Sequence, residues 1–454
     1  MERNLTTGSI WKNVVLFSLP YFLSYFLQTL YGMADLFIIG QYEGVASTTA
    51  VSIGSQVMHM ITVMIVGLAM GATVSIGQSV GAGDKKKTAL NIGNTVTIFM
   101  IVAVVLMAVL LVFTGKIVTV MSTPAAAIEG TKTYLTICFI GIPFITAYNI
   151  ISSIFRGMGD SKSPMYFIAV ACVTNIVLDY VFIGAFHLGA AGAALGTTCS
   201  QAVSVIVSLA VIIKQDTGIK LQKSDFQLRK LITGQIIKIG IPVACQDGLI
   251  QVAFIIITII ANQRGLNDAA AVGIVEKIIS FLFLVPSSML STVSALGAQN
   301  IGAGKMDRAK KTLAYAVAIT VCFGFCVAVL MQFFAEPVVG LFTDTGSASG
   351  AEVARLGSQY LKGYVWDCVF AGIHFSFSGY FCACGRSGLS FLHNIIAIAC
   401  VRVPGVYLTS RLFPDTLFPM GLATAAGSVL SAIICITAFC ILFCERKERG
   451  NGNA

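Results

Sequence analysis

Long runs without a single charged side chain dominate the sequence. A membrane-spanning helix needs about 18 residues or more of this kind. Charged residues make up only 11% of the chain, whereas about 25% is usual in a soluble domain. The sequence therefore predicts an all-α integral membrane protein. Seven charge-free runs exceed the required length, at 44–83, 88–115, 133–155, 180–213, 278–304, 312–335 and 416–444.

Shorter apolar stretches with isolated charged residues supply five more spans, near 14–40, 165–186, 237–261, 359–381 and 391–411. The first of these carries an acid and has no small-residue cleavage site, so we expect a first span rather than a signal peptide. We therefore expect twelve transmembrane helices. The other seven lie near 46–74, 91–113, 134–155, 191–213, 271–293, 312–334 and 419–443.

The distribution of basic residues predicts the orientation. With the amino terminus inside, 21 of the 29 Lys and Arg residues fall in cytoplasmic segments and six in external loops. Cytoplasmic loops are enriched in such residues. We therefore expect a multi-pass protein of the inner cell membrane with both termini in the cytoplasm. The net charge of +9 is then mostly a topology signal, and we expect no nucleic-acid partner.

Motifs of enzymes and metal sites do not stand out. The four histidines, at 59, 187, 374 and 393, have no metal-ligand spacing, and the sequence has neither an HExxH nor a Walker motif. Most of the 13 cysteines sit in apolar spans, where they act as small packing residues. We therefore expect no enzyme activity, no cofactor and no resident metal.

An internal repeat divides the chain. Gln78-Ser-Val-Gly-Ala-Gly83 recurs 221 residues later as Gln299-Asn-Ile-Gly-Ala-Gly304, and Pro20 matches Pro242. Six spans per copy give both halves the same orientation, as in parallel-repeat transporters. We expect two six-helix lobes, at 1–213 and 236–454, joined by a cytoplasmic linker at 214–235.

The acids inside the spans indicate where an ion binds. A charged group at the bilayer centre costs about 2.5–3.5 kcal/mol. Asn175 and Asp179 share a face of the fifth span, at a depth similar to that of Asp35 in the first. Two neighbouring carboxylates cannot both ionise cheaply, so the pair can exchange a proton. Alternatively, their oxygens form a cage for Na+ together with Asn175. In the alignment of the two repeats, Asp35 corresponds to Ile257 and Asp179 corresponds to Gly405. These acids are therefore absent from the second lobe.

The second lobe has acids of its own. Asp247, Glu276 and Asp367 either line a substrate cavity or neutralise local bases. Gln28 and Tyr31, on the first span before Asp35, are further candidates for cavity-lining groups.

The whole sequence resembles the multidrug and toxic compound extrusion (MATE) family, closest to its DinF-like branch. The motifs that carry the resemblance are the first span SLPYFLSYFLQTLYGMADLFIIGQ, the paired G-A-G loops, RGMGDSKSP, and NIVLDYVFI followed by LGAAGAALGT. The resemblance implies drug export driven by inward H+ or Na+. It also implies a cation site in the amino lobe formed by Asp35, Asn175, Asp179 and Thr197, and a role for Tyr31.

We therefore expect a monomeric antiporter that exchanges cationic or amphipathic drugs for H+ or Na+ by alternating access. An alternative is a flippase for lipid-linked oligosaccharides. Its pyrophosphate substrate would favour cationic cavity walls, but five acids here face two intramembrane bases, Lys277 and Arg402. Another alternative, a passive channel, would not move substrate uphill.

Overall fold

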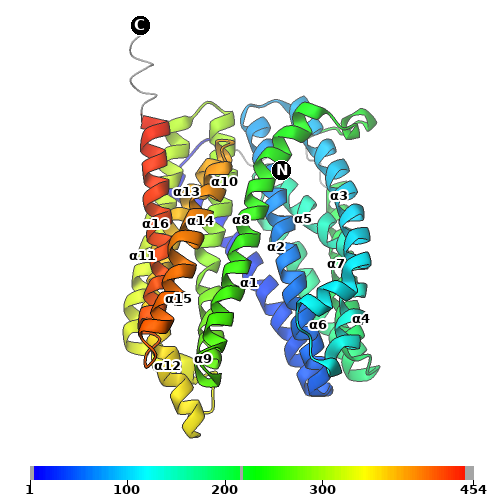
Figure 1. Cartoon of the computed structure of the whole chain (residues 1–454). Helices are drawn as coiled ribbons and strands as arrows, with labels where there is room; N and C mark the ends of the chain where they lie inside the picture. Colours follow the sequence, from blue (N-terminus) through cyan, green and yellow to red (C-terminus); the bar gives the residue numbers. More distant parts are fainter. Residues whose placement is uncertain (1–4, 215–217, 445–454) are drawn as a thin grey trace. The chain divides into compact units, whose positions relative to one another are not determined.

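Helices make up almost all of the described chain (Figure 1). The computed structural model describes residues 5–214 and 218–444, and no β-strand occurs within these ranges. This confirms the all-α fold class. The described helices fall into two compact units, Met1–Ala244 with Ala298–Lys305, and Cys245–Gly297 with Met306–Ala454. The expected lobe boundaries and the linker at 214–235 stay predictions, and residues 215–217 of that linker lie outside the described ranges.

In the first unit, α1 packs on α6, α2 on α5, and both α4 and α6 pack on α7. Short 3-10 turns span Ala125–Ala127 and Lys223–Phe226, and a π-helical segment, Tyr180–Ala185, continues α6. The helices are α1 Ile10–Tyr42, α2 Val45–Gly81, α3 Lys85–Val120, α4 Ile128–Ile140, α5 Ile142–Gly157, α6 Lys162–Asp179, α7 Gly189–Lys214 and the first part of α8 Lys230–Asn262.

In the second unit, α11 packs on α12 and α13, and α16 packs on α12, α13 and α15. Two π-helical segments occur, Ile398–Arg402 between α14 and α15, and Cys440–Cys444 after α16. Besides the rest of α8, the helices are α9 Leu266–Leu282, α10 Leu284–Gly302, α11 Met306–Gly340, α12 Ala348–Tyr364, α13 Asp367–Ala383, α14 Gly388–Ala397, α15 Val403–Leu412 and α16 Phe418–Phe439.

Each expected span coincides with a helix or a broken helix. Among the described residues, ten helices are long and apolar enough to cross a membrane. The pair Ala125–Ile140 and Ile142–Gly157, bent by 48°, makes an eleventh if it forms one span. At the expected span 359–381 the chain breaks into α12 and α13, which have 17 residues each. Length and composition thus account for ten or eleven of the twelve expected spans.

Glycines at matching repeat positions have the same unusual backbone. Gly83 and Gly304 have φ of +70° and +72°, and Gly159 and Gly385 have φ of +93° and +72°. Only glycine enters this left-handed region without steric cost, which is why it so often follows a helix end. The two copies of the sequence repeat therefore share the same backbone conformation at these glycines.

The two G-A-G motifs also contact each other within the first unit. A Cβ at Gly81 would collide with the carbonyl of Gln299, and a Cβ at Gly302 would collide with the carbonyl of Gln78. The contact is reciprocal, with each motif supplying one glycine and one glutamine carbonyl. Both of these glycines are therefore required by the close approach of the two backbones.

The C-terminal part of α1 is anchored in an apolar core. Ile38 and Ile39 are buried there and pack in one cluster with Ile183 and Ala193. Because Ile38 and Ile39 lie one turn after Asp35, their packing fixes the rotation of the helix. That rotation directs Asp35 toward α6 and α7.

Candidate cation site

Three helices of the first unit bring four predicted polar residues together. Helix α1 supplies Asp35, α6 supplies Asn175 and Asp179, and α7 supplies Thr197. The exposed fractions of Asp35 and Asp179 are 2% and 0%, and Asn175 and Thr197 are also buried. The contact of α1 with α6 and of α6 with α7 thus unites residues that are up to 162 positions apart.

The Asp35 carboxyl group lies at the centre of this cluster. The Thr197 hydroxyl donates a hydrogen bond to Asp35 Oδ2 at 3.1 Å, and Asp35 also interacts with the side chains of Asp179 and Asn175. Several polar atoms nevertheless form no hydrogen bond of good geometry with the described residues. These atoms are Asp35 Oδ1, both carboxylate oxygens of Asp179, and both Oδ1 and Nδ2 of Asn175.

A glycine makes room for Asp179, and sequence analysis did not identify it. A Cβ at Gly196 would collide with Asp179 Oδ1 and would lie 3.5 Å from Asn175 Nδ2. The absence of a side chain at this position therefore lets the acid sit directly against α7. The small-residue run Leu188-Gly-Ala-Ala-Gly-Ala-Ala-Leu-Gly196 was the available signal.

Within the described chain, neither Asp35 nor Asp179 forms an ion pair with a basic side chain. The ion pairs found there are Lys132–Glu129, Arg264–Asp268, Arg355–Glu352 and Arg402–Asp367. A buried charge without a partner is strongly unfavourable. The site can meet this cost by taking up a proton or by binding a metal cation through its carboxylate oxygens.

Tyr31 and Gln28 lie on the same helix as Asp35. Tyr31 interacts electrostatically with Asp35 and packs on the apolar cluster around Tyr148. Gln28 is half-buried, two helical turns before Asp35. Their role in a cavity stays a prediction, but the position of Tyr31 beside the acid cluster favours it.

In the second unit, Asp367 pairs with a base. Arg402 Nη2 donates to Asp367 Oδ2 at 2.7 Å, and both side chains are buried. Sequence analysis left open whether the second-unit acids line a cavity or neutralise bases. For Asp367 this pairing favours neutralisation.

Glu276 and Asp247 have no ion-pair partner among the described residues. The Thr258 hydroxyl donates to the Glu276 carboxylate, at 3.2 Å from Oε2, while Lys277 is exposed. Asp247 is half-buried on α8. Tyr360 interacts electrostatically with both Glu276 and Asp367, so these two acids lie near the same tyrosine.

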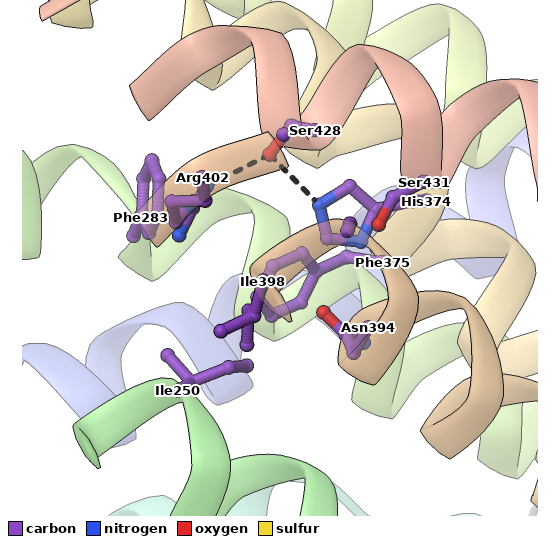
Figure 2. A pocket seen from close by; sticks show the side chains of 11 residues that line it. Ile250, Phe283, His374, Phe375, Asn394, Ile398, Arg402, Ser428 and Ser431 are labelled. Carbon is purple, nitrogen blue, oxygen red and sulfur yellow. Dashed lines mark hydrogen bonds between the residues drawn. The ribbon is translucent and has the colours of Figure 1, made fainter. Parts of the chain in front are cut away.

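The structure brings two histidines together that appear scattered in the sequence. The rings of His374 on α13 and His393 on α14 have centroids 5.4 Å apart. His374 and Arg402 both contact Ser428 and line a small cavity of about 20 Å³ (Figure 2). No metal-ligand spacing signalled this pair, because its members belong to different helices.

Comparison with known proteins gives two matches to one family. The MatE family profile matches residues 20–181 and again residues 242–408. The two matches begin 222 residues apart, the same offset that separates Pro20 from Pro242. The repeat inferred from short motifs thus extends over both halves of the chain.

Similar proteins and one similar structure cover nearly the whole chain. The probable multidrug resistance proteins YoeA and YpnP of Bacillus subtilis are 26% and 29% identical to it, over 89% and 90% of this chain and 88% and 90% of theirs. A crystal structure of MATE in complex with MaL6 has a TM-score of 0.90 at 22% identity, and covers 98% of this chain and 99% of that one. At this identity the structural match establishes the fold alone.

Proposed function

The chain belongs to the MatE family of multidrug and toxic compound extrusion transporters, and on that premise we propose that it exports drugs in exchange for H+ or Na+. Membership makes it a multi-pass membrane transporter rather than an enzyme. The observation that carries the proposal is the buried pair Asp35 and Asp179, which has carboxylate oxygens without a hydrogen bond and no ion-pair partner in the described chain.

The proposed ion site consists of Asp35, Asn175, Asp179 and Thr197. When both carboxylates are ionised and no cation is bound, they repel each other. A proton or Na+ that enters from outside removes this repulsion and stabilises the state that holds it. A ligand shifts a conformational equilibrium only by its differential affinity for the two states. In this proposal the buried acids give the two conformations different affinities for the ion.

The energy of one ion suffices for useful export. A unit charge that moves down 100 mV releases about 2.3 kcal/mol. Because about 1.4 kcal/mol corresponds to a factor of ten, one ion supports a drug gradient of roughly fiftyfold if the drug step is itself electroneutral. The exchange therefore needs no cofactor or nucleotide.

The substrates we propose are cationic or amphipathic drugs. YoeA and YpnP are named as probable multidrug resistance proteins, which does not favour a lipid-linked oligosaccharide flippase. Asp247 and Glu276, which form no ion pair within the described residues, would line the substrate cavity with Gln28 and Tyr31. Carboxylates in such a wall would attract an organic cation.

The proposed architecture follows the repeat. Residues 1–213 and 236–454 form the two lobes of an alternating-access transporter, and 214–235 link them. A single chain carries a complete ion site, so a monomer suffices. We place both termini in the cytoplasm, with the chain in the inner cell membrane.

Ethidium efflux from cells tests the ion site. In Asp35→Asn the two-acid cluster loses one charge, and we expect efflux to fall at least about tenfold, equivalent to about 1.4 kcal/mol. Asp344→Asn, which changes an exposed acid, is the matched control and should export normally. Wild-type efflux by folded Asp35→Asn would refute the proposed function.

Proteoliposomes under separately imposed pH and Na+ gradients identify the coupling ion. We expect ethidium to accumulate uphill with one of the two gradients and to leak back when an ionophore collapses it. A passive channel would only equilibrate the dye. Equal transport without any gradient would therefore contradict antiport.

A further inference from the structure

The second unit contains residues that correspond to the sixth-span part of the first-unit cation site. Gly196 and Thr197 on α7 correspond to Gly427 and Ser428 on α16, and Ser200 corresponds to Ser431, each 231 residues later. The offset has grown from 221 at the G-A-G motifs, as loop insertions along the second copy would produce. Both pairs lie on the sixth span of their repeat.

The contacts made by these residues also correspond. A Cβ at Gly196 would collide with Asp179, and a Cβ at Gly427 would lie 2.9 Å from Arg402 Cβ and 3.3 Å from its Nε. In both units a glycine of the sixth span therefore accommodates a charged residue of the fifth. Gly405, the sequence counterpart of Asp179, lies one turn after Arg402 on the same helix face.

The fifth span contains a π-helical segment next to the charged residue in both units, although not at the same repeat position. A π-helical segment begins directly after Asp179, at Tyr180–Ala185, and another ends with Arg402, at Ile398–Arg402. Single π-helical turns inside α-helices are frequent at functional sites. Each charged residue thus lies directly beside an irregular stretch of its helix.

The sites differ in the source of the acid and in what neutralises it, because Asp367 lies on the fourth span of its repeat whereas Asp35 lies on the first. In the first unit the Thr197 hydroxyl donates to Asp35. In the second, Arg402 Nη2 donates to Asp367 Oδ2 at 2.7 Å and to Ser428 Oγ at 3.0 Å. The guanidinium thus stands between a buried carboxylate and the hydroxyl that corresponds to Thr197, where an inorganic cation would find oxygen ligands.

We propose that Arg402 is a tethered cation that permanently fills the second-unit counterpart of the ion site, so that each chain exchanges an ion at one site only. This inference rests on the proposed function, because it assumes that the first-unit site takes up the coupling ion. It assigns Asp367 to an ion pair through Oδ2, while its Oδ1 forms no hydrogen bond with the described residues. Because Arg402 occupies the second-unit position, only the first-unit site is left to exchange an ion in each chain.

The surroundings of Arg402 hold its partners in place. His374 Nε2 lies 3.3 Å from Ser428 Oγ, and His393 bridges Ser378 and Ser431 at 2.8 Å and 3.2 Å. The adjoining cavity of about 20 Å³ (Figure 2) has room for about one water molecule. An organic drug does not fit into it.

Further ionisable groups face the pair. Glu276 interacts electrostatically with Tyr360 and Tyr364, and both tyrosines interact with Asp367 and Arg402. Any experiment on the second-unit site must therefore separate the titration of Asp367 from that of these groups and of His374. Comparison of variants with and without the Asp367 carboxylate does so.

The test removes the tethered cation in a background whose first-unit site is silent. In purified full-length Asp35→Asn/Asp179→Asn, we expect a melting temperature that does not respond to replacement of N-methylglucamine by Na+ at pH 8. Adding Arg402→Gln frees the Asp367 carboxylate, which must then take up Na+ or a proton. We expect the melting temperature to rise by about 2 °C or more with Na+, or on lowering the pH from 9 to 6.

A further substitution makes the result specific. With Asp367→Asn added to Arg402→Gln, the new ion response should disappear, since the only freed carboxylate is gone. If the Arg402→Gln variant responds identically with and without Asp367→Asn, at either pH and with either cation, the inference is overturned. An ion response of the Asp35→Asn/Asp179→Asn background that Asp367→Asn abolishes would also overturn it.

The two proposals fail separately. If Asp35→Asn/Asp179→Asn still drives ethidium uphill, the proposed function is wrong. If instead its transport is lost but removal of Arg402 creates no Asp367-dependent ion response, the first-unit site stands and the tethered-cation inference falls. Variants that elute as aggregates in size-exclusion chromatography are replaced by Arg402→Met, which keeps most of the packing volume.

Discussion

At the scale of the residue, sequence analysis predicted the acids of the candidate site but not their neutralising groups. Asp35, Asn175 and Asp179 could be identified because a polar residue in an apolar span has few structural reasons to be there, whereas Thr197 came only from the family resemblance. Whether a base reaches such an acid depends on helix rotations that an isolated sequence does not specify. In the described chain Arg402 reaches Asp367, whereas Asp35 forms no ion pair.

Gly196 should be as important for the ion site as the acids. In Gly196→Ala the new methyl group would displace Asp179, and overpacking of this kind typically costs about 1–3 kcal/mol. We expect gradient-driven ethidium efflux to fall roughly tenfold or more in proteoliposomes. Gly115→Ala is the control, because that position on α3 has open space around it. Equal loss in both variants would point to a general folding defect.

Thr197 offers a way to identify the ion. In Thr197→Val the hydroxyl that contacts Asp35 is lost, and a hydrogen bond to a charged group contributes about 1.5–3 kcal/mol. If Na+ is the ion, the site loses an oxygen and the half-saturating Na+ concentration should rise roughly tenfold to hundredfold. If H+ is the ion, the carboxylate loses a donor, and the pH midpoint of transport should rise.

Thr197→Ser is the matched variant for this experiment, because it keeps the hydroxyl and removes only a methyl group. It should transport with nearly the wild-type ion dependence. Unchanged ion dependence in Thr197→Val, measured by initial rates of dye transport over a range of Na+ and pH, would remove Thr197 from the site.

At the scale of the element, the repeat made the fold predictable where its motifs are local. The G-A-G turns and a matching pair of proline-containing helices, α1 and α8, of 33 residues each, were visible as short matching sequences. The breaks between α4 and α5 and between α12 and α13 were not, because each lies inside a stretch that reads as one apolar span. The π-helical segments likewise could not be predicted from the amino-acid composition, since they differ from an α-helix in backbone hydrogen bonding and not in the type of side chain.

The reciprocal contact of the G-A-G motifs predicts a matched pair of phenotypes. Gly81→Ala and Gly302→Ala should each destabilise the protein by about 1–3 kcal/mol, because each new methyl group meets a glutamine carbonyl. The loss in the double variant should be less than the sum, since the residues share one contact region. Thermal unfolding in detergent measures all three, with Gly115→Ala as the control. Full additivity would argue that the contacts are independent.

At the scale of the whole molecule, comparing the depths of Asp35 and Asp179 along their spans was enough to predict that the first and fifth spans share one site. Both run in the same direction in the predicted topology, and their acids lie a similar number of residues from the outer end. The MatE match to both halves supports the repeat, which pairs the first span with the seventh and the fifth with the eleventh. The repeat could not predict that Arg402 pairs with Asp367 in the second half, because the two copies share backbone positions but not side-chain chemistry.

The topology itself can be tested by labelling. Cysteines introduced singly in place of Lys116 and Lys86 should react differently with a membrane-impermeant maleimide applied to intact cells. We expect Lys116→Cys, in a predicted external loop, to be labelled, and Lys86→Cys, in a predicted cytoplasmic segment, to react only after lysis. The unsubstituted protein controls for its own cysteines. The reverse result would invert the proposed orientation.

The reciprocal packing of Gly81 on Gln299 and of Gly302 on Gln78 limits how far the two halves of the chain can diverge in evolution. A bulkier residue in one copy is tolerated only together with a compensating change in its twin, so the paired turns must evolve jointly. The acids are outside this packing constraint, since Asp35 and Asp179 correspond to Ile257 and Gly405 in the second copy, and each half can therefore gain or lose an acid on its own.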